Sequence, residues 1–329
     1  MTLFIHPGSG PAALLAAAAL VLSAPAAAQV FYAGGGTARA DASGFGQSVS
    51  LPIDNQSALG AAPVGTVTSS RYALLTGGTG SVGALAQTSS RPALGGVHLQ
   101  AYTRIEVHNG DPTAGEFGYT VAEATGQFAD AFFLNVPGYA AGTLFTVTAG
   151  VQVDAINALT PTISNNVGAS TFETVAAWTS RVILYPSIGG QVLVEQSDGE
   201  SCAHNQFGAG CTGSGGGSRT FSFTMPNQSW AMQLQLVGWA RTRSQANVIG
   251  GGGAYVTGLA DLGHTIGWGG ISTVVDPAGN VVSGFSAVST SSGFDYRNAY
   301  VSAVPEPASP LLLLLGAGVI AVWKRRRKA

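Results

Sequence analysis

Three carboxylates lie close together in the sequence and could do acid–base or metal chemistry. They are Glu195, Asp198 and Glu200, and they precede Cys202 in a stretch rich in glycine and serine. Two carboxyl groups at a suitable separation carry out glycoside hydrolysis. Loop carboxylates together with carbonyl oxygens also bind Ca²⁺. The sequence favours a solvated turn over either site, because acidic side chains in such a stretch ordinarily face water.

Other residues with catalytic potential are scattered along the chain. The histidines between the two ends, which share no metal-ligand spacing, are His98, His108, His204 and His264. The chain contains no Gly-x-Ser-x-Gly elbow, no His-Glu-x-x-His, no phosphate-binding loop with lysine and no EF-hand spacing. We therefore predict a protein that is not an enzyme, with no catalytic residue, no metal and no cofactor.

The two cysteines, Cys202 and Cys211, predict a disulfide bond. An even number of cysteines close in sequence pairs readily in an exported protein. The bond would close the Gly-rich loop from Ala203 to Gly210 and stabilise the fold by about 2–3 kcal/mol. Two alternatives remain. One is a metal site that includes His204, and the other is a pair of free thiols.

Tryptophans are the residues through which a β-protein could contact a sugar, because an exposed ring stacks on a pyranose face. Trp239 continues an alternating pattern and is predicted to lie in the core. Trp268 stands between Gly267 and Gly269, and it is the candidate for a sugar contact. A core position is the favoured interpretation for Trp268 as well.

The C-terminus has a three-part layout. The motif Pro305-Glu306-Pro307 comes first, and the apolar segment 310–323 follows it. The basic residues that end the chain are Lys324, Arg325, Arg326, Arg327 and Lys328. As a transmembrane helix the segment would be roughly 21 Å long, which is short against a hydrocarbon core of about 30 Å. The basic residues would stay cytoplasmic, and the two prolines hold Glu306 in an extended stretch.

This tail resembles the PEP-CTERM sorting signal of Gram-negative bacteria. The resemblance covers about the last 26 residues and includes all three parts in order. It implies recognition of the motif by an exosortase, a membrane protease-transpeptidase. It also implies transient anchoring in the inner membrane, then release or attachment at the cell surface, often alongside exopolysaccharide. An ordinary C-terminal membrane anchor is the alternative.

The N-terminal end predicts a signal peptide over residues 1–28. An apolar run leads to Ala26-Ala27-Ala28, an A-x-A site that places cleavage between Ala28 and Gln29. The first eleven residues lack the lysine or arginine that such a peptide normally carries. Either a misplaced start codon explains that departure, or His6 and the amino terminus supply the charge. A buried Ala-rich helix is the alternative to a signal peptide.

Residues 29–304 form the body that is exported. They carry 9 arginines, 15 carboxylates and no lysine, a net charge of −6 with histidine neutral. A Lys-free acidic body does not fit a nucleic-acid binder, which needs a basic patch. Charged residues make up only 9% of the whole chain, well below the usual quarter. Most of the surface must therefore be polar without charge.

Alternating apolar and polar residues predict an all-β body. The pattern is clear from Val97 onward, with long runs at 144–153 and 232–239, and weaker over the Gly/Ala/Ser-rich residues 29–96. Strands at short spacing point to an antiparallel, jelly-roll-like β-sandwich between a signal helix and a transmembrane helix. A short helix is expected within 165–178. Residues 276–280 predict a hairpin turn, with positive φ at Gly279 or Asn280.

The expected function is that of an exported cell-surface or extracellular-matrix protein. Its role would be structural or adhesive and linked to exopolysaccharide, and its partners would be an exosortase and, transiently, the inner membrane. A secreted carbohydrate-active hydrolase or lyase and a sugar-binding module are the alternatives.

Overall fold

The computed structural model describes residues 30–300 except 79, 112, 165–169 and 188–190. The predicted signal peptide, its cleavage site and the C-terminal tail all lie outside these residues. Within the described part, no helix is long and apolar enough to cross a membrane.

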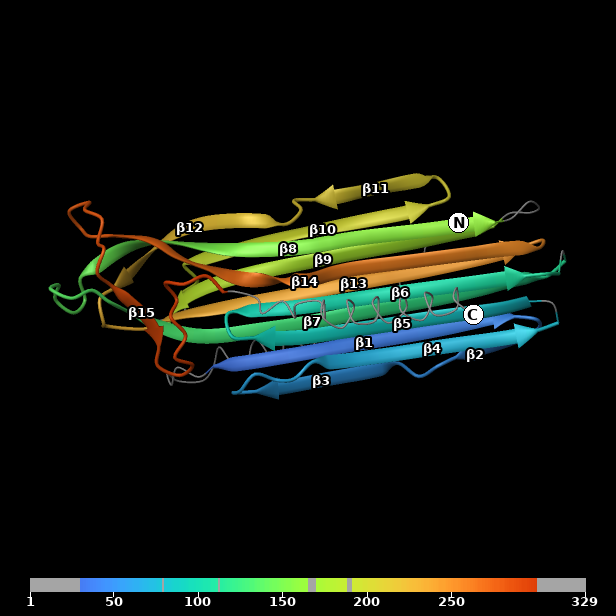
Figure 1. Cartoon of the computed structure of the whole chain (residues 1–329), viewed down its shortest axis with the longest axis horizontal. Coiled ribbons are helices and arrows are strands. Elements are labelled where there is room, and N and C mark those ends of the chain that lie inside the picture. Colours follow the sequence, from blue (N-terminus) through green and yellow to red (C-terminus); the bar gives the residue numbers. More distant parts are fainter. Residues whose placement is uncertain (1–29, 79, 112, 165–169, 188–190, 301–329) are drawn as a thin grey trace, which may run out of the picture.

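The described residues form fifteen β-strands, drawn in Figure 1. They are β1 (Phe31–Gly44), β2 (Gln47–Ser50), β3 (Asp54–Gly60), β4 (Val67–Gly77), β5 (Gly80–Ala93), β6 (Gly96–Asn109), β7 (Gly115–Asn135), β8 (Leu144–Ser164), β9 (Thr171–Pro186), β10 (Val194–Asn205), β11 (Gly208–Gly213), β12 (Gly217–Pro226), β13 (Met232–Ile249), β14 (Gly252–Val275) and β15 (Ser286–Ser289).

The strands build two antiparallel sheets. In sheet A the order is β11-β10-β9-β13-β7-β1-β2, with β3 added to β1 and β15 added to β7. In sheet B the order is β12-β8-β14-β6-β5-β4. From β6 to β9 and from β12 to β15 the chain changes sheet at every connection. The prediction of an all-β, antiparallel body is confirmed.

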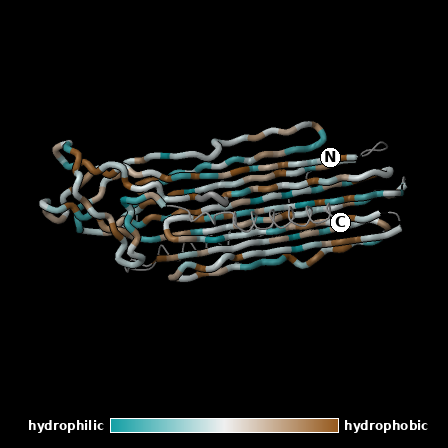
Figure 2. Tube along the Cα trace, in the orientation of Figure 1, coloured by the Kyte–Doolittle hydropathy of each residue, from teal (hydrophilic) through white to brown (hydrophobic). Residues whose placement is uncertain are grey.

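The core lies between the two sheets and follows from the period-2 alternation. On β13 the even-numbered residues from Met232 to Val248 are buried, while most odd-numbered ones are partly exposed. Alternate side chains of a strand point to opposite faces, so one face of each sheet packs inward. Figure 2 shows the same mixture of apolar and polar residues along the strands. The outer faces carry most of the polar side chains and some exposed apolar ones.

Several strands are longer than the sequence pattern predicted. Separate runs at 117–124 and 131–136 are parts of β7, which has 21 residues, and β14 has 24 residues. The sequence pattern predicts two separate strands there, because the polar residues Gln127 and Asp130 between the runs interrupt the alternation, and both are buried. Pairing with strands on both sides supplies the backbone hydrogen bonds that hold these weak stretches extended.

The short helix expected within 165–178 is wrong for the part that the structure describes. Residues 171–178 belong to β9, which pairs with β13 on one side and β10 on the other. Trp178, opposite Ala240, is fully buried. Two-sided strand pairing overrides a weak helical pattern, because propensity is only a small term beside tertiary contacts.

The predicted turn at 276–280 is confirmed, with Gly279 at φ +88°. One Asp276 carboxylate oxygen accepts hydrogen bonds from the backbone N–H groups of Ala278 and Asn280 at 2.9 and 2.8 Å. Hydrogen bonds from the backbone and the side chain of Asn280 are the main cause of a lowered Asp276 pKa, which is about 2. The alternating pattern also predicts a strand over 281–288, and the structure places a shorter one, β15, which pairs with β7.

Glu116 on β7 gives the body a predictable pH dependence. The side chain is fully buried beneath Gly44, and neither carboxylate oxygen has a hydrogen-bond partner of ordinary geometry. Burial, with the charge of Asp111, raises the pKa of Glu116 above its usual 4.5. The folded state therefore holds this proton more tightly than the unfolded chain, so stability should fall as pH rises from about 4.5 through the folded pKa.

Glu116→Gln should remove that loss, because glutamine carries no charge to bury. The expected melting temperature at pH 8 is about 2 °C or more above that of the wild type, and the difference should vanish near pH 4. Scanning calorimetry across this range is the measurement. Glu106→Gln, at an exposed position, is the control and should leave the pH profile unchanged. A Glu116→Gln protein that is equally or less stable at pH 8 would contradict the assignment.

Candidate functional site

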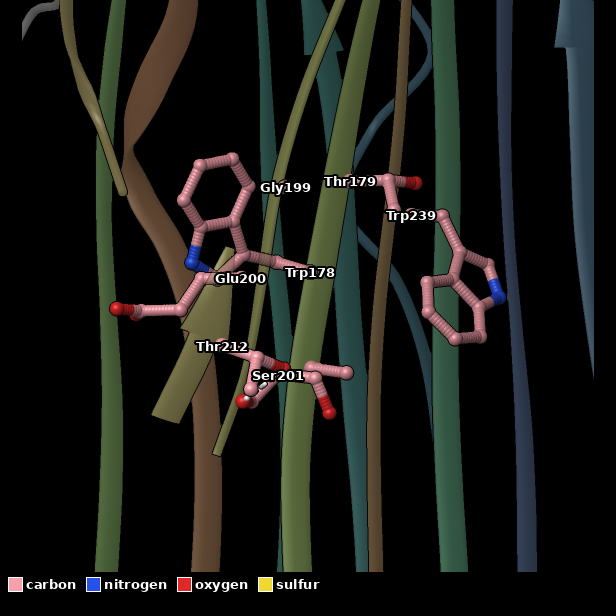
Figure 3. Close-up of a pocket in the computed structure, with 8 residues that line it drawn as sticks. Trp178, Thr179, Gly199, Glu200, Ser201, Thr212 and Trp239 are labelled. Carbon is pink, nitrogen blue, oxygen red and sulfur yellow. Dashed lines mark hydrogen bonds between the residues drawn. The ribbon is translucent and has the colours of Figure 1, made fainter. Parts of the chain in front are cut away.

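The outer face of sheet A carries an open recess of about 290 Å³. It lies over β9, β10, β11 and β13, and the outward-facing residues that line it are Ala177, Thr179, Gly199, Ser201, Thr212 and Trp239, with Trp178 and Glu200 adjoining it from the other side of the sheet. Figure 3 shows Trp239 and Thr179 on one side of the strands, and Trp178 and Glu200 on the other. The volume is at the lower end of the range for small-molecule sites.

Strand register brings the recess residues together. Trp239 pairs with Thr179, which pairs with Gly199, so these three form one row across the sheet. In the next row Ser201 lies between Ala177 and Thr212. All of these side chains point outward, because the alternating residue Trp178 points into the core. The recess is thus lined by one large ring, two threonines and a serine.

Gly199 keeps the floor of the recess open. A Cβ atom at this position would lie 2.9 Å from the carbonyl oxygen of Trp178 and 3.1 Å from Cγ2 of Thr179. Any other residue would therefore displace Thr179 and fill the space beside the Trp239 ring. The glycine is a packing requirement of the site, and it leaves one face of the recess without a side chain.

Trp239 is partly exposed, so the prediction that it lies in the core is wrong. Its Nε1 donates a hydrogen bond of 2.8 Å to Oε1 of Glu123 on β7. This bond satisfies the polar end of the indole and fixes the ring on the sheet surface. A tryptophan with an apolar face and a satisfied N–H is suited to stacking contacts.

Arginine–carboxylate pairs lie on the same outer face of sheet A as the recess. Arg181 lies 2.7 Å from Glu195, and Arg243 lies 2.8 Å from Glu173. Arg39 is 2.7 Å from Asp41. The outward-facing charged residues on β1, β7, β9, β10 and β13 balance one another; they are Arg39, Arg181, Arg241, Arg243, Asp41, Glu123, Glu173 and Glu195. A balanced face favours a ligand of low net charge.

Trp268, the predicted sugar contact, lies in the core instead. Its side chain is 1% exposed and packs against Phe132, Phe221 and Tyr296. The Nε1 group donates to the carbonyl oxygen of Tyr296 at 2.7 Å. A ring enclosed on all sides cannot stack on a sugar, so the sugar-contact assignment is wrong and the favoured core interpretation is confirmed.

The carboxylates Glu195, Asp198 and Glu200 do not converge on one site. Glu195 points to the outer face and binds Arg181, whereas Asp198 and Glu200 point to the opposite side of β10. Asp198 pairs with Arg219 at 3.4 Å. Glu200 accepts a hydrogen bond from Asn157 at 3.1 Å. Strand alternation separates residues that the sequence placed together.

The disulfide between Cys202 and Cys211 is confirmed. The two cysteines face each other across the β10–β11 hairpin, so the stretch that had been expected to be a loop is paired strand. Among the described residues, Glu200 and these two cysteines form the one group of potential metal ligands within 4.8 Å of one another. A disulfide offers no thiolate to a metal, and the carboxylate alone is not a site.

The histidines whose side chains the structure describes lie in separate places. His98 Nε2 is 3.1 Å from the hydroxyl of Tyr300, and His204 contacts the ring of Phe172. His108 is exposed near the end of β6. No nucleophile-and-base pair is formed by these three side chains.

Sequence reasoning missed the Trp239–Glu123 pair, whose members are 116 residues apart. Only the alternation of β13 carried a signal, since it placed Trp239 on the face opposite Leu236 and Ala240. That signal was ambiguous, because the odd-numbered positions of the strand also include apolar residues such as Val237.

Comparison with known proteins finds one match, at the C-terminal end. Residues 303–328 match the model of the PEP-CTERM protein-sorting motif. No curated protein and no solved structure matches the chain. The tail is thus a PEP-CTERM sorting motif, as its layout had indicated, and it marks an exported protein that is sorted by exosortase.

Proposed function

We propose that this protein is a non-enzymatic component of the cell surface or extracellular matrix that contacts exopolysaccharide through the Trp239 recess. The observation that carries the proposal is the combination of Trp239, Thr179, Ser201 and Thr212 around a glycine floor on an open β-sheet face. The role is structural or adhesive, and the ligand is a weakly charged or neutral glycan chain.

The chemistry of the recess suits a sugar. The apolar face of Trp239 offers a stacking surface, and the hydroxyl groups of the neighbouring side chains can donate and accept hydrogen bonds. Because the recess lies on an open sheet face, it can accommodate one unit of a long chain whose ends extend past it. Such a site binds a polymer without requiring a chain end.

The hydrolase or lyase alternative has less support on this face. Glycoside hydrolysis needs two carboxyl groups on either side of the scissile bond. Glu123 is bound to Trp239, and Glu173 and Glu195 are each bound to an arginine. These carboxylates position the ring and the arginines, which fits a binding face better than an acid–base pair.

The tail indicates where the protein would bind glycan. We infer that the segment 310–323 holds the protein in the inner membrane until an exosortase-type protease acts at Pro305-Glu306-Pro307. The basic residues 324–328 would remain on the cytoplasmic side. Release then places the body at the cell surface or in the matrix, where polysaccharide is the polymer that it would meet.

Trp239→Ala should weaken glycan binding by the exported protein. Loss of stacking on the sugar is worth about 1–3 kcal/mol by analogy with other aromatic stacking contacts, or about 5- to 150-fold in affinity. The measurement is binding of the purified body, residues 29–304, to a glycan array, followed by calorimetry with the best ligand. Tyr72→Ala, an exposed aromatic on β4, is the matched control and should bind normally. Equal binding by both variants, or no glycan bound by the wild type, would refute the proposal.

A further inference from the structure

The start of β1 and the last described strand, β15, meet on the same edge of β7. Phe31 of β1 pairs with Ala129, and Ser289 of β15 pairs with Phe132. Three residues along a strand correspond to about 10 Å. The first and the last described strand of the body therefore lie at one place on sheet A, although more than 250 residues separate them in the chain.

A buried carboxylate between these two strands fastens the C-terminal side. Asp130 is 2% exposed and accepts hydrogen bonds from Ser289 Oγ at 2.8 Å, Ser292 Oγ at 2.6 Å and the Tyr296 hydroxyl at 2.8 Å. Residues 286–300, here called the C-terminal strap, are thus held against the core. In Figure 1 the strap lies at the end of the sandwich where β15 is labelled.

The strap remains attached up to its last residue. The Trp268 indole donates to the carbonyl oxygen of Tyr296. The backbone N–H of Tyr300 donates to the carbonyl oxygen of Trp268 at 2.6 Å. Phe294 and Tyr300 also approach Gly95, at the β5–β6 turn. The chain is therefore fixed to the sandwich until Tyr300.

The tail allows little distance between this point and the membrane. Pro305 is five residues beyond Tyr300, and Pro310 is ten residues beyond it. A fully extended chain covers at most about 3.6 Å per residue, which gives about 18 Å and about 36 Å. On the other side, Gln29 is two residues before Phe31. The body cannot move far from the bilayer while the tail is anchored there.

Apolar side chains are exposed at the same corner. Val288 on β15 is 40% exposed, and Leu59 on β3, opposite Ala33 of β1, is 65% exposed. Both lie on the outer face of sheet A. Arg91 on β5, in sheet B, is exposed close enough to Tyr300 of the strap for its charge to act on that hydroxyl, and it offers a positive charge to anionic head groups. Figure 2 shows further apolar residues in the loops at this end.

From this geometry we propose that the terminal corner, formed by the start of β1, the C-terminal strap and Leu59, rests on the lipid surface of the inner membrane while the tail anchors the protein. The corner holds the Pro305–Pro307 motif at the membrane surface, where a membrane-embedded protease can reach it. The inference rests on the tail anchoring described under the proposed function. The occupant of the corner is the bilayer surface.

Photo-cross-linking tests this arrangement. The full chain, with Pro305, Glu306 and Pro307 replaced by alanine to prevent processing, is reconstituted in vesicles of phosphatidylethanolamine and phosphatidylglycerol. Benzoylphenylalanine is placed at Val288 or Leu59, and in the control at Ile249, which is equally exposed at the opposite end of β13. We expect at least about fivefold more lipid adduct from Val288 and Leu59 than from Ile249.

The outcomes separate this inference from the proposed function. Vesicle flotation checks the anchoring, and a chain that does not float refutes the tail anchor and the corner contact together. A chain that floats but gives equal or no lipid adducts at Val288 and Ile249 refutes the corner alone. Adducts in cells that join Val288 to a protein instead of lipid would also overturn it. Glycan binding is measured separately and does not depend on any of these results.

Discussion

Asp130→Ala should lower the free energy of unfolding of the body by about 3–5 kcal/mol. The carboxylate accepts bonds from two serine hydroxyls, the Tyr296 hydroxyl and the backbone N–H of Ala131. Its removal leaves these donors without their acceptor, and those of Ser289 and Tyr296 are buried away from water. The measurement is urea denaturation of residues 29–304, with hydrogen exchange to locate the loss in the C-terminal strap.

Asp154→Asn is the matched control for that substitution. Asp154 is exposed and accepts one bond from the Gln152 amide at 2.9 Å, so the change should cost less than about 0.5 kcal/mol. Asp130→Asn keeps one acceptor oxygen and should fall between the two. If Asp130→Ala costs no more than the control, the carboxylate does not hold the strap.

Trp268→Ala should destabilise the body by a similar amount, about 3–5 kcal/mol. The ring contacts Phe132, Phe221 and Tyr296, and its removal opens a cavity that these rings cannot fill without moving. Because the Trp268 indole donates to the carbonyl oxygen of Tyr296, its removal takes one attachment from the strap, which should also become more accessible to protease. Calorimetry and limited proteolysis of the body measure the two effects.

Trp268→Phe and Trp239→Ala provide the comparison. Phenylalanine retains most of the buried ring, and the Tyr296 carbonyl still accepts the N–H of Ile271 at 3.1 Å, so less than half of the loss is expected. Trp239→Ala, on the outer face, should cost about 1 kcal/mol or less. A Trp268→Ala protein as stable as the Trp239→Ala protein would place Trp268 outside the structural core.

Local features of the chain were predictable from the sequence. The PEP-CTERM motif is a contiguous string, and its layout of motif, apolar segment and basic end is read directly. The turn at 276–280 depends on neighbouring residues, with Gly279 supplying the positive φ. The Cys202–Cys211 bond joins residues only nine apart. Each feature is determined by residues within a short stretch, so no distant contact was needed to predict it.

Strand existence was also predictable, but strand length was not. The alternation over 144–153 predicted the first part of β8, which continues to Ser164. Pairing with β12 stops at Val153, so the later half of β8 has no β12 neighbour on that edge. Its alternation is weak and did not predict the extension. Pairing with β14 holds that half extended, and such pairing is invisible to local pattern.

The tertiary structure alone decided which tryptophan faces water and which residues meet. Trp239 and Trp268 both sit in alternating strands, and alternation defines two faces without saying which face is buried. That choice depends on how the sheets stack, which places Trp268 among three aromatic rings and Trp239 beside Glu123. Likewise, Phe31 pairs with Ala129, 98 residues away, and the Tyr296 hydroxyl donates to Asp130, 166 residues away. The sequence by itself determined that this protein carries a sorting signal and that its body is built of β-strands. Its recess and its terminal corner exist only through contacts between distant strands.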